Sequence, residues 1–372
     1  MGDFRIPLFK LNFDRSEEIA VLKTLKSKWI SSGPRAIELE KKFAKVIGSK
    51  YSLATSNCTA SLHLAMLTAG IKPGDEVLCP SLTFVATVNA IRYVGAIPVF
   101  CDITSDNDLT ISPNEIEKNI SGKSKAVIVM HYAGFPCNMR KIMSLSRKYN
   151  IKVIEDACHA PLSEYEGKIV GTFGVSSCYS FFSNKNISTG EGGIFATNKK
   201  DYYIQAKLLR SHGMTSASYD RSKRDSFNYD VLELGYNYRI DDIRASIGLV
   251  QLSKLKKDIT QREKIRKMYI KCIKELENVN IPFNDFNGRS SNYIFPILVN
   301  NRDKVRNYLS KKGIQTSIHY QPVHRFKIYK DYYSKLPITD NVAGRLITLP
   351  MYSSLKKNEI AYIVKCLSEV IE

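Results

Sequence analysis

The chain contains 372 residues, 44% hydrophobic and 24% charged, the composition of a globular protein long enough for one large α/β domain and a smaller one. No apolar stretch is long enough to span a bilayer, and the start from Met1 to Arg5 lacks the apolar core of a signal peptide, so we expect a cytoplasmic protein with no membrane partner. The 55 basic and 36 acidic residues give a formal net charge of +19, which is compatible with nucleic acid, an acidic membrane surface or an anionic small substrate.

An amphipathic stretch lies near the start of the chain. Residues 16–29 predict a helix that ends before the run Ser31–Pro34. The apolar residues on one side of this helix are Ile19, Leu22, Leu25 and Trp29. Such a face packs either on the main domain or on a second subunit, and both alternatives remain open at this point.

Between about residues 50 and 200, short apolar runs alternate with helical patterns. The predicted strands are Tyr51–Ala54, Glu76–Cys79, Ile97–Cys101, Ala126–Met130, Lys152–Glu155, Ser177–Phe182 and Gly193–Thr197. One intervening helix start is marked by a serine cap, Ser112, with Pro113 at the first helical position. This alternation predicts a largely parallel sheet covered on both faces, with ligands at the carboxyl ends of the strands.

After about residue 240 the pattern changes to long Lys-rich helices. The elements expected after them are a strand near Tyr293–Val299, a helix Asp303–Lys312, a strand near Ile314–Ile318 and a helix Lys357–Ile371. The basic runs keep apolar residues at helical spacing, which favours a solvated helix face over a binding stripe. We therefore predict a large domain over residues 1–250 and a smaller C-terminal α/β domain over residues 251–372.

The eight cysteines are widely scattered and form no Cys-x-x-Cys pair. Several lie inside apolar runs such as Val77–Pro80. They are typical of reduced, mostly buried thiols, and we predict neither a disulfide framework nor a metal site.

Chemically informative residues follow several predicted strands. The segment Asn57–Leu64 opens a helix, where backbone N–H groups hold either a phosphate or an ordinary cap, and Phe84 offers either an aromatic face or core packing. Asp156 ends an apolar strand, and its carboxylate is either a partner for a cationic ring nitrogen or an ordinary cap. Lys185 lies in an aromatic, glycine-flanked loop. A desolvated lysine stays uncharged and condenses with an aldehyde, whereas a lysine in a polar loop is usually a solvated charge.

Together these segments resemble the sugar aminotransferases of the DegT/DnrJ/EryC1/StrS family, and the resemblance covers nearly the whole chain. Further motifs that carry it are Trp29–Pro34, Gly74–Val77, Pro80–Thr87, Gly235–Arg239 and His319–His324. The spacings from Asp156 to His159 and to Lys185 are also similar to those of the family. The resemblance implies pyridoxal 5'-phosphate as cofactor on the aspartate aminotransferase fold (fold type I), with a mostly parallel mixed sheet in the large domain.

The resemblance also implies a role for each site residue. Lys185 would bind the cofactor as a Schiff base and shuttle a proton, Asp156 would keep the ring nitrogen protonated, and His159 would lie near the ring hydroxyl. Further cofactor contacts would come from Phe84 on the ring face, from Cys58, Thr59 and Ser180 on the phosphate, and from Asn237 of the neighbouring subunit of a homodimer. The sugar substrate would be contacted by Tyr320, His324 and His212.

Other pocket candidates carry simpler interpretations. We expect His63 to be a partly buried histidine with a hydrogen-bond partner rather than a catalyst. Gly192 and Gly193 would let the backbone turn closely beside the lysine loop. His131 and Glu191 receive no role.

The resemblance predicts a transamination, in which an amino acid, L-glutamate, donates the amino group and a keto-sugar attached to a nucleoside diphosphate accepts it. One alternative is a deoxysugar dehydratase of the same fold, in which histidine replaces the lysine; the lysine at 185 argues against it. The other is a cofactor-binding regulatory or nucleic-acid-binding protein, suggested by the net charge. The sequence has no helix-turn-helix signature and no RNA-binding aromatic motif, so we expect no nucleic-acid partner.

Overall fold

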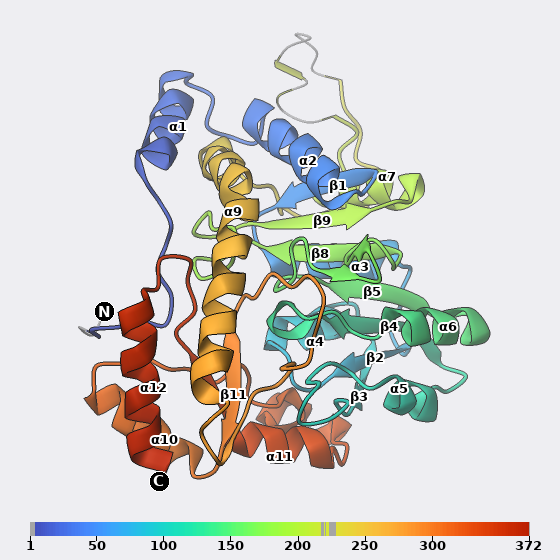
Figure 1. Cartoon of the computed structure of the whole chain (residues 1–372). Coiled ribbons are helices and arrows are strands. Elements are labelled where there is room, and N and C mark those ends of the chain that lie inside the picture. Colours follow the sequence, from blue (N-terminus) through green and yellow to red (C-terminus); the bar gives the residue numbers. More distant parts are fainter. Residues whose placement is uncertain (1–3, 217–218, 220, 223–227, 372) are drawn as a thin grey trace.

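The centre of the molecule is a seven-stranded sheet with the order β1-β9-β8-β5-β4-β2-β3 (Figure 1). The computed structural model describes residues 4–216, 219, 221–222 and 228–371, so the first three residues, where no signal peptide is expected, lie outside the described part. The strands are β1 (Tyr51–Thr55), β2 (Glu76–Pro80), β3 (Ile97–Cys101), β4 (Ser124–Met130), β5 (Lys152–Asp156), β8 (Ser176–Ser180) and β9 (Gly193–Thr197).

All seven strands expected between residues 50 and 200 are present, with ends shifted by at most a few residues. Neighbours pair in parallel from β3 through β2, β4 and β5 to β8, while β9 runs antiparallel to both β8 and β1. The sheet is therefore mixed and mostly parallel, as predicted. Because the parallel strands end at one edge, the residues that follow them are brought together there.

Helices cover both faces of this sheet, and the alternation of side chains along the strands assigns each face its own core. In β4, Ile128 packs with the core under α3, α4 and α7, whereas Val127 and Val129 pack with the core under α5 and α6. Helices α2 and α9 cover the β1, β8 and β9 end of that second face. The bounds are α2 (Pro34–Ile47), α3 (Cys58–Thr68), α4 (Val85–Tyr93), α5 (Pro113–Asn119), α6 (Met139–Tyr149), α7 (Lys200–Leu209) and α9 (Asp242–Ile273).

Short elements connect these layers. They are the 3-10 helices η1 (Tyr132–Gly134), η2 (Val323–Arg325) and η3 (Lys327–Tyr332), and a hairpin of β6 (Glu164–Tyr165) and β7 (Lys168–Ile169). Among them η1 directly follows β4, so it lies at the carboxyl edge of the sheet where the predicted site residues converge.

A second, three-stranded antiparallel sheet lies in the C-terminal part, with the order β10-β11-β12. Its elements are β10 (Val279–Asn280), β11 (Phe295–Val299), β12 (Leu346–Leu349), α10 (Arg302–Lys311), α11 (Pro337–Arg345) and α12 (Lys357–Ile371). The prediction of a strand at Ile314–Ile318 was wrong. This segment makes only isolated bridges, from Ile314 to Ile6 and from Ser317 to Thr348.

Helix α9 belongs to two hydrophobic cores. Its first half places Leu252 and Leu255 against α2, and its second half places Tyr269 and Ile273 in the core around β11. In Figure 1 it runs from the large sheet down to the C-terminal elements. The domain boundary expected at residue 250 falls inside this continuous helix, so the division into residues 1–250 and 251–372 stays a prediction.

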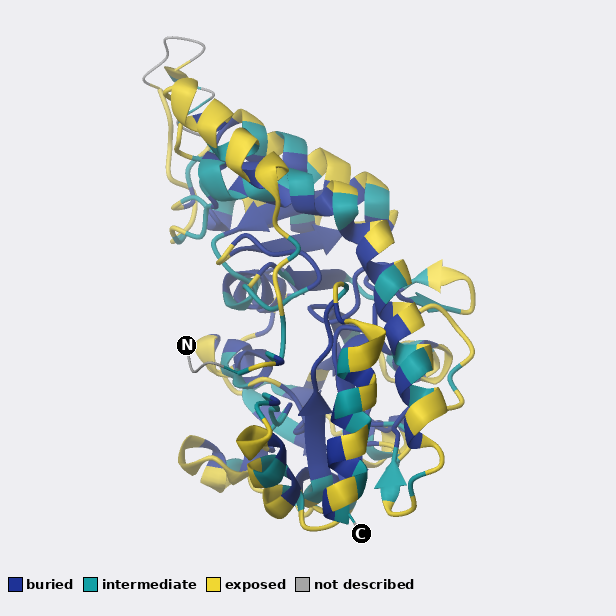
Figure 2. Ribbon diagram, turned by 60° about the vertical axis from the view of Figure 1, so that its left-hand side comes forward, coloured by how far each residue is buried: buried dark blue, intermediate teal, exposed yellow. Residues whose placement is uncertain are grey.

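Helix α1 (Arg15–Lys26) docks through polar side chains. Asp14 and Glu17 form a capping box at its start, and the buried Glu17 accepts a hydrogen bond from Gln251 Nε2 at 2.7 Å on α9. The residues of the predicted apolar face that lie on α1 instead remain exposed; they are Ile19 (42%), Leu22 (54%) and Leu25 (48%). For these three residues the alternative in which the apolar face packs on the main domain is therefore wrong. The fourth, Trp29, lies beyond the end of α1, which is shorter than predicted, and is half-buried beside Gly33. Across the molecule, the strands are mostly buried and the outer faces of the helices are exposed (Figure 2).

All eight cysteines are free, and six of them are buried. The basic runs of α9 lie mostly on a solvated face, as expected, although Arg262 is buried in an ion pair with Asp258. No helix in the described ranges is both long and apolar enough to cross a bilayer. The cytoplasmic location expected from the sequence stays a prediction.

Candidate active site

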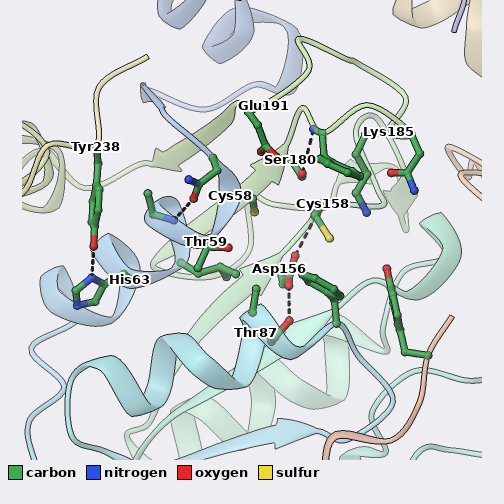
Figure 3. Close-up of a pocket in the computed structure, with 18 of the residues that line it drawn as sticks. Cys58, Thr59, His63, Thr87, Asp156, Cys158, Ser180, Lys185, Glu191 and Tyr238 are labelled. Carbon is green, nitrogen blue, oxygen red and sulfur yellow. Dashed lines mark hydrogen bonds between the residues drawn. The ribbon is translucent and has the colours of Figure 1, made fainter. Parts of the chain in front are cut away.

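A cavity of about 910 Å³ opens where β5 and β8 end (Figure 3). This is the edge of a parallel sheet at which ligands collect. Seven of the predicted site residues line it: Cys58, Thr59, Phe84, Asp156, Ser180, Lys185 and Tyr320. The fold thus brings together most of the residues singled out from the sequence, from widely separated segments.

Asp156, the last residue of β5, is 2% exposed. Thr87 on α4 donates its hydroxyl proton to Oδ2 at 2.7 Å, and the backbone N–H of Cys158 donates to Oδ1 at 3.2 Å. Thr83 Oγ1 lies 2.8 Å from Thr87 Oγ1, which extends the hydrogen-bonded chain. The carboxylate is therefore held in one orientation by two hydrogen-bond donors.

Lys185 lies in the loop between β8 and β9, where its backbone N–H donates to Phe182 O at 2.9 Å. Its Nζ lies 4.2 Å from the centre of the Tyr293 ring. Burial lowers the pKa of the Lys185 amine, but Tyr293, Cys158 and Asp156 raise it, and the net result is a pKa above the ordinary lysine value. The neighbouring groups thus outweigh burial, which does not support the expectation that desolvation keeps this amine uncharged.

The amino end of α3 forms one wall of the cavity. Asn57 caps the helix by accepting a hydrogen bond from the Ala60 N–H at 2.8 Å, which leaves the N–H groups of Cys58 and Thr59 at the open helix end. Gly193 packs so closely here that an added Cβ would lie 2.6 Å from the Asn57 carbonyl carbon. The N–H groups and the dipole of the helix end can together hold an anion. The close turn expected beside the lysine loop is present at Gly192, where an added Cβ would clash with Thr189, whereas Gly193 packs against the end of α3.

Aromatic side chains form the other walls. Phe84 precedes the first residue of α4 and is 53% exposed, and its ring centre lies 5.8 Å from that of Tyr320. Tyr236 and Tyr238 stack with their centres 4.9 Å apart, beside His63. Phe84 therefore lines the cavity with an aromatic ring that can stack on a planar ligand.

Comparison with known proteins decides what kind of site this is. Residues 12–368 match the family model described as the DegT/DnrJ/EryC1/StrS aminotransferase family. The chain belongs to this family. It is therefore an aminotransferase, and the cofactor of the family is pyridoxal phosphate.

Individual relatives cover almost the whole chain. The GDP-perosamine synthase of Escherichia coli O157:H7 is 38% identical over 367 residues, which are 98% of each chain. Among solved structures, Helicobacter pylori PseC, an aminotransferase involved in the biosynthesis of pseudoaminic acid, matches with a TM-score of 0.91 at 27% identity, over 99% of each chain. The PLP form of the sugar aminotransferase Spr1654 from Streptococcus pneumoniae, described as putative, matches with a TM-score of 0.89 at 26% identity, over 99% of this chain and 97% of that one. The fold is therefore fold type I.

The groups lining the cavity fit the cofactor of this aminotransferase family. Asp156 offers an oriented carboxylate to a protonated ring nitrogen, and Phe84 offers a ring face. The amino end of α3 offers N–H groups to a phosphate, with Ser180 beside it. Lys185 offers the amine that condenses with an aldehyde.

His159 does not line the cavity. It is fully buried behind Tyr320, and its Nε2 lies 2.8 Å from the Tyr320 hydroxyl. The catalytic role given to His159 in the sequence analysis requires direct contact with the ligand, and the described residues do not place it there.

Three other predicted residues also lie away from the cavity. His324 is buried, with Nδ1 2.7 Å from Ser81 Oγ and Nε2 3.2 Å from Asp340 Oδ1, so it ties the η2 segment to the residue after β2. His212 and Asn237 are exposed and lie on two segments that cross, where Ser211 pairs with Asn237 and the backbone N–H of His212 donates to Tyr236 O at 2.9 Å. Direct substrate contact by His324 or His212 within one chain is not supported by this placement.

The structure adds residues that the sequence analysis missed. Thr87 lay within a quoted motif, one turn after Thr83, so its helical position was a usable signal. Tyr236 and Tyr238 flank Asn237. Because side chains alternate in direction along an extended segment, the two tyrosines could have been placed together on the side opposite Asn237. Tyr293 gave no sequence signal, because its place under Lys185 depends on how the C-terminal part folds back.

Two residues without an assigned role now have positions. His131 is fully buried and pairs with Glu155 at 3.1 Å, and Glu155 also accepts hydrogen bonds from backbone N–H groups of Phe173 and Gly174. Glu191 lines the cavity. His63 is 5% exposed, also lines the cavity, and has the expected partner, since its Nδ1 lies 3.0 Å from the Tyr238 hydroxyl. In the part of the chain that the structure describes, no cluster of His, Cys, Asp and Glu is arranged to bind a metal.

Proposed function

We propose that this aminotransferase transfers an amino group from L-glutamate to a nucleotide-linked keto-sugar in amino-sugar biosynthesis. The observation that carries the proposal is the convergence of Lys185, Asp156 and the amino end of α3 in one cavity of a chain of this family. The names of two relatives support a sugar as acceptor, since one is a GDP-perosamine synthase and the other acts in pseudoaminic acid biosynthesis. The lysine at 185 argues against the dehydratase alternative.

Bound pyridoxal phosphate would supply an aldehyde carbon and an electron-accepting ring that carry the amino group between the two substrates. Asp156, held by Thr87, would keep a proton on the ring nitrogen. Lys185 would bind the cofactor and, once displaced by the incoming amino group, move a proton with Nζ as the base. Phe84 would cover one ring face and exclude water from it.

The acceptor's nucleotide is expected to bind through its diphosphate. The net charge of +19 favours association with an anionic substrate but does not select a base. We therefore expect GDP-linked keto-sugars to be the first class to test, because a relative that shares 38% of its residues is named for a GDP-linked amino sugar.

We further propose that two chains form a homodimer with shared active sites. Tyr236 and Tyr238 line the cavity, whereas Asn237 between them is exposed. Asn237 is therefore free to reach the cofactor phosphate bound by a second copy. The exposed apolar face of α1 is available for the same association.

Mixed dimers test this arrangement. If Asn237 acts on the neighbouring site, mixing Lys185→Ala chains with Asn237→Ala chains assembles heterodimers in which one site has both native groups, and activity returns from two impaired proteins. If Asn237 acts within its own chain, no site in the mixture is native, and activity stays at the level of the impaired variants. Light scattering of the wild-type protein checks that it is a dimer.

The first experiment on the function itself is the visible absorption spectrum of the purified protein with pyridoxal phosphate. The expected result is a band of lysine-bound cofactor that L-glutamate bleaches, followed by its return when an accepted nucleotide-linked keto-sugar is added. A band that glutamate leaves unchanged would contradict the donor assignment. Absence of any band would contradict the role of Lys185.

A further inference from the structure

His159 has both ring nitrogens engaged behind the cavity. The backbone N–H of Ala133, in η1, donates to Nδ1 at 3.3 Å. On the other side of the ring, Nε2 lies 2.8 Å from the hydroxyl of Tyr320. The histidine thus bridges the end of β4 to a residue of the cavity wall.

These two contacts determine where the imidazole carries its proton. An amide N–H can only donate, so a proton on Nδ1 would place two N–H groups against each other at 3.3 Å. The neutral ring therefore carries its proton on Nε2, and His159 donates to the oxygen of Tyr320. The backbone of η1 fixes this tautomer.

The surroundings keep His159 neutral and Tyr320 protonated. Burial, together with Lys185 and His319, lowers the pKa of His159 well below the ordinary histidine value. Burial raises the pKa of Tyr320 well above that of an ordinary tyrosine. The titratable groups that face this pair are Tyr132, Asp156, Cys158, Lys185, Tyr293 and His319.

Tyr320 has its own hydroxyl proton left over. The phenol oxygen receives the proton of His159, and no other hydrogen bond to a described residue uses the phenol proton. Tyr320 lines the cavity together with Phe84 and Lys185. A ligand in the cavity is therefore the available acceptor for this proton.

We propose that His159 is a positioning residue that orients Tyr320 as a hydroxyl donor to an acceptor oxygen of the ligand bound beside Lys185. The acceptor oxygen belongs either to the cofactor or to the substrate that it carries, and the inference rests on the proposed function to that extent. It replaces direct ligand contact by His159 with contact by Tyr320. In this proposal the buried imidazole of His159 neither gains nor loses a proton during the reaction.

A double-mutant cycle tests the coupling. Tyr320→Phe is expected to weaken pyridoxal phosphate binding or to slow a half-reaction about tenfold, the effect of one hydrogen bond. His159→Leu should have a similar effect alone and less than about a twofold effect in the Tyr320→Phe background. Tyr165→Phe, which removes another tyrosine hydroxyl bonded to a side chain, Asn138, is the matched control and should leave all values unchanged.

The two sources of the acceptor oxygen are separated by the step that changes. A change in pyridoxal phosphate affinity and in the pH titration of its bound absorption band assigns the oxygen to the cofactor. A change confined to the half-reactions with L-glutamate or with the accepted keto-sugar assigns it to the substrate. If Tyr320→Phe leaves every one of these within about twofold of wild type, the proposal is overturned.

His159→Gln distinguishes positioning from acid–base catalysis. A glutamine amide can accept from Ala133 and donate to Tyr320, so this variant should stay within about threefold of wild type with an unchanged pH profile. A loss as large as that of His159→Leu would overturn the positioning role. Failure of the proposed function is recognised separately, because the wild-type spectrum itself would then lack the band or the response to glutamate.

Nitrogen-15 spectra of the histidines provide a readout independent of activity. The signal of His159, assigned by its disappearance in His159→Gln, should show a neutral ring protonated on Nε2 that does not titrate between about pH 6 and 9. A proton on Nδ1, or titration in this range, would overturn the inference.

Discussion

Asp156 depends on a hydroxyl group from another element for its orientation. Thr87→Val keeps the shape of the side chain but removes the donor to Oδ2. We expect pyridoxal phosphate affinity to fall about threefold to tenfold, because the carboxylate loses one of its two oriented hydrogen bonds. Spectroscopic titration with the cofactor measures the change. Thr87→Ser retains the hydroxyl and should stay near wild type; equal losses in both variants would contradict the explanation.

Lys185 is expected to be indispensable for chemistry but not for holding the cofactor. Asp156, Phe84 and the amino end of α3 contact the cofactor in the proposed arrangement without it. Lys185→Ala should therefore abolish both half-reactions while the protein still binds pyridoxal phosphate noncovalently, as equilibrium dialysis can measure. Normal turnover by this variant would exclude the proposed role.

Some residue positions could be predicted from the sequence, and others could not. Asp156 and Lys185 carry their chemistry in local motifs that directly adjoin predicted strands, so strand ends were enough to bring them together. His159 shares the same motif, yet its ring is buried between the backbone of Ala133 and the cavity-wall residue Tyr320. The direction of a buried ring depends on partners distant in sequence, and no local pattern contains that information.

At the scale of elements, the contact between β9 and α3 links folding to the cofactor site. Gly193→Ala would place a methyl group 2.6 Å from the backbone of Asn57. We expect the free energy of unfolding to fall by about 1–3 kcal/mol and pyridoxal phosphate to bind more weakly, since the helix end must move. Urea unfolding and cofactor titration measure the two effects.

Gly122→Ala is the matched control for this change. An added Cβ at Gly122 meets nothing within 4 Å, so its unfolding free energy should remain near that of wild type. If Gly193→Ala has the unfolding free energy and the pyridoxal phosphate affinity of wild type, β9 does not constrain the amino end of α3.

The elements that the sequence predicted well are the buried strands of the large sheet. Runs such as Ala126–Met130 are apolar on both faces, which is the pattern of a parallel strand covered on both sides. In contrast, β12 is only four residues long and directly follows α11, so it had no separate signal. Ile314–Ile318 has a strand-like composition, but its bridges go to two different segments, and no ladder forms.

At the scale of the whole molecule, buried histidines make stability depend on pH. Burial, with Lys185 nearby, lowers the pKa of His319 to about 3. An unfolded histidine has a pKa of about 6.5, so below that value the unfolded chain binds more protons than the native one. The contribution to stability is complete above about pH 6.5 and is lost as the pH falls toward 3, with about 2 kcal/mol lost by pH 5.

His319→Gln should therefore reduce the acid dependence of the unfolding free energy, whatever it does to the value at neutral pH. His159 has a pKa lowered in the same direction, so part of the dependence should remain. Urea unfolding at several pH values between about 5 and 7.5 measures the slope. Identical slopes for wild type and variant would show that His319 does not remain neutral in the native protein.

The sharing of α9 between two cores restricts how this protein can be recombined with its relatives. The helix runs unbroken from Asp242 to Ile273, and each half completes a different core. A chimera joined near residue 250 would pair each half of the helix with foreign packing partners on one side. Exchange of acceptor specificity between relatives should therefore succeed when α9 is inherited whole, with junctions in the connections before Asp242 or after Ile273.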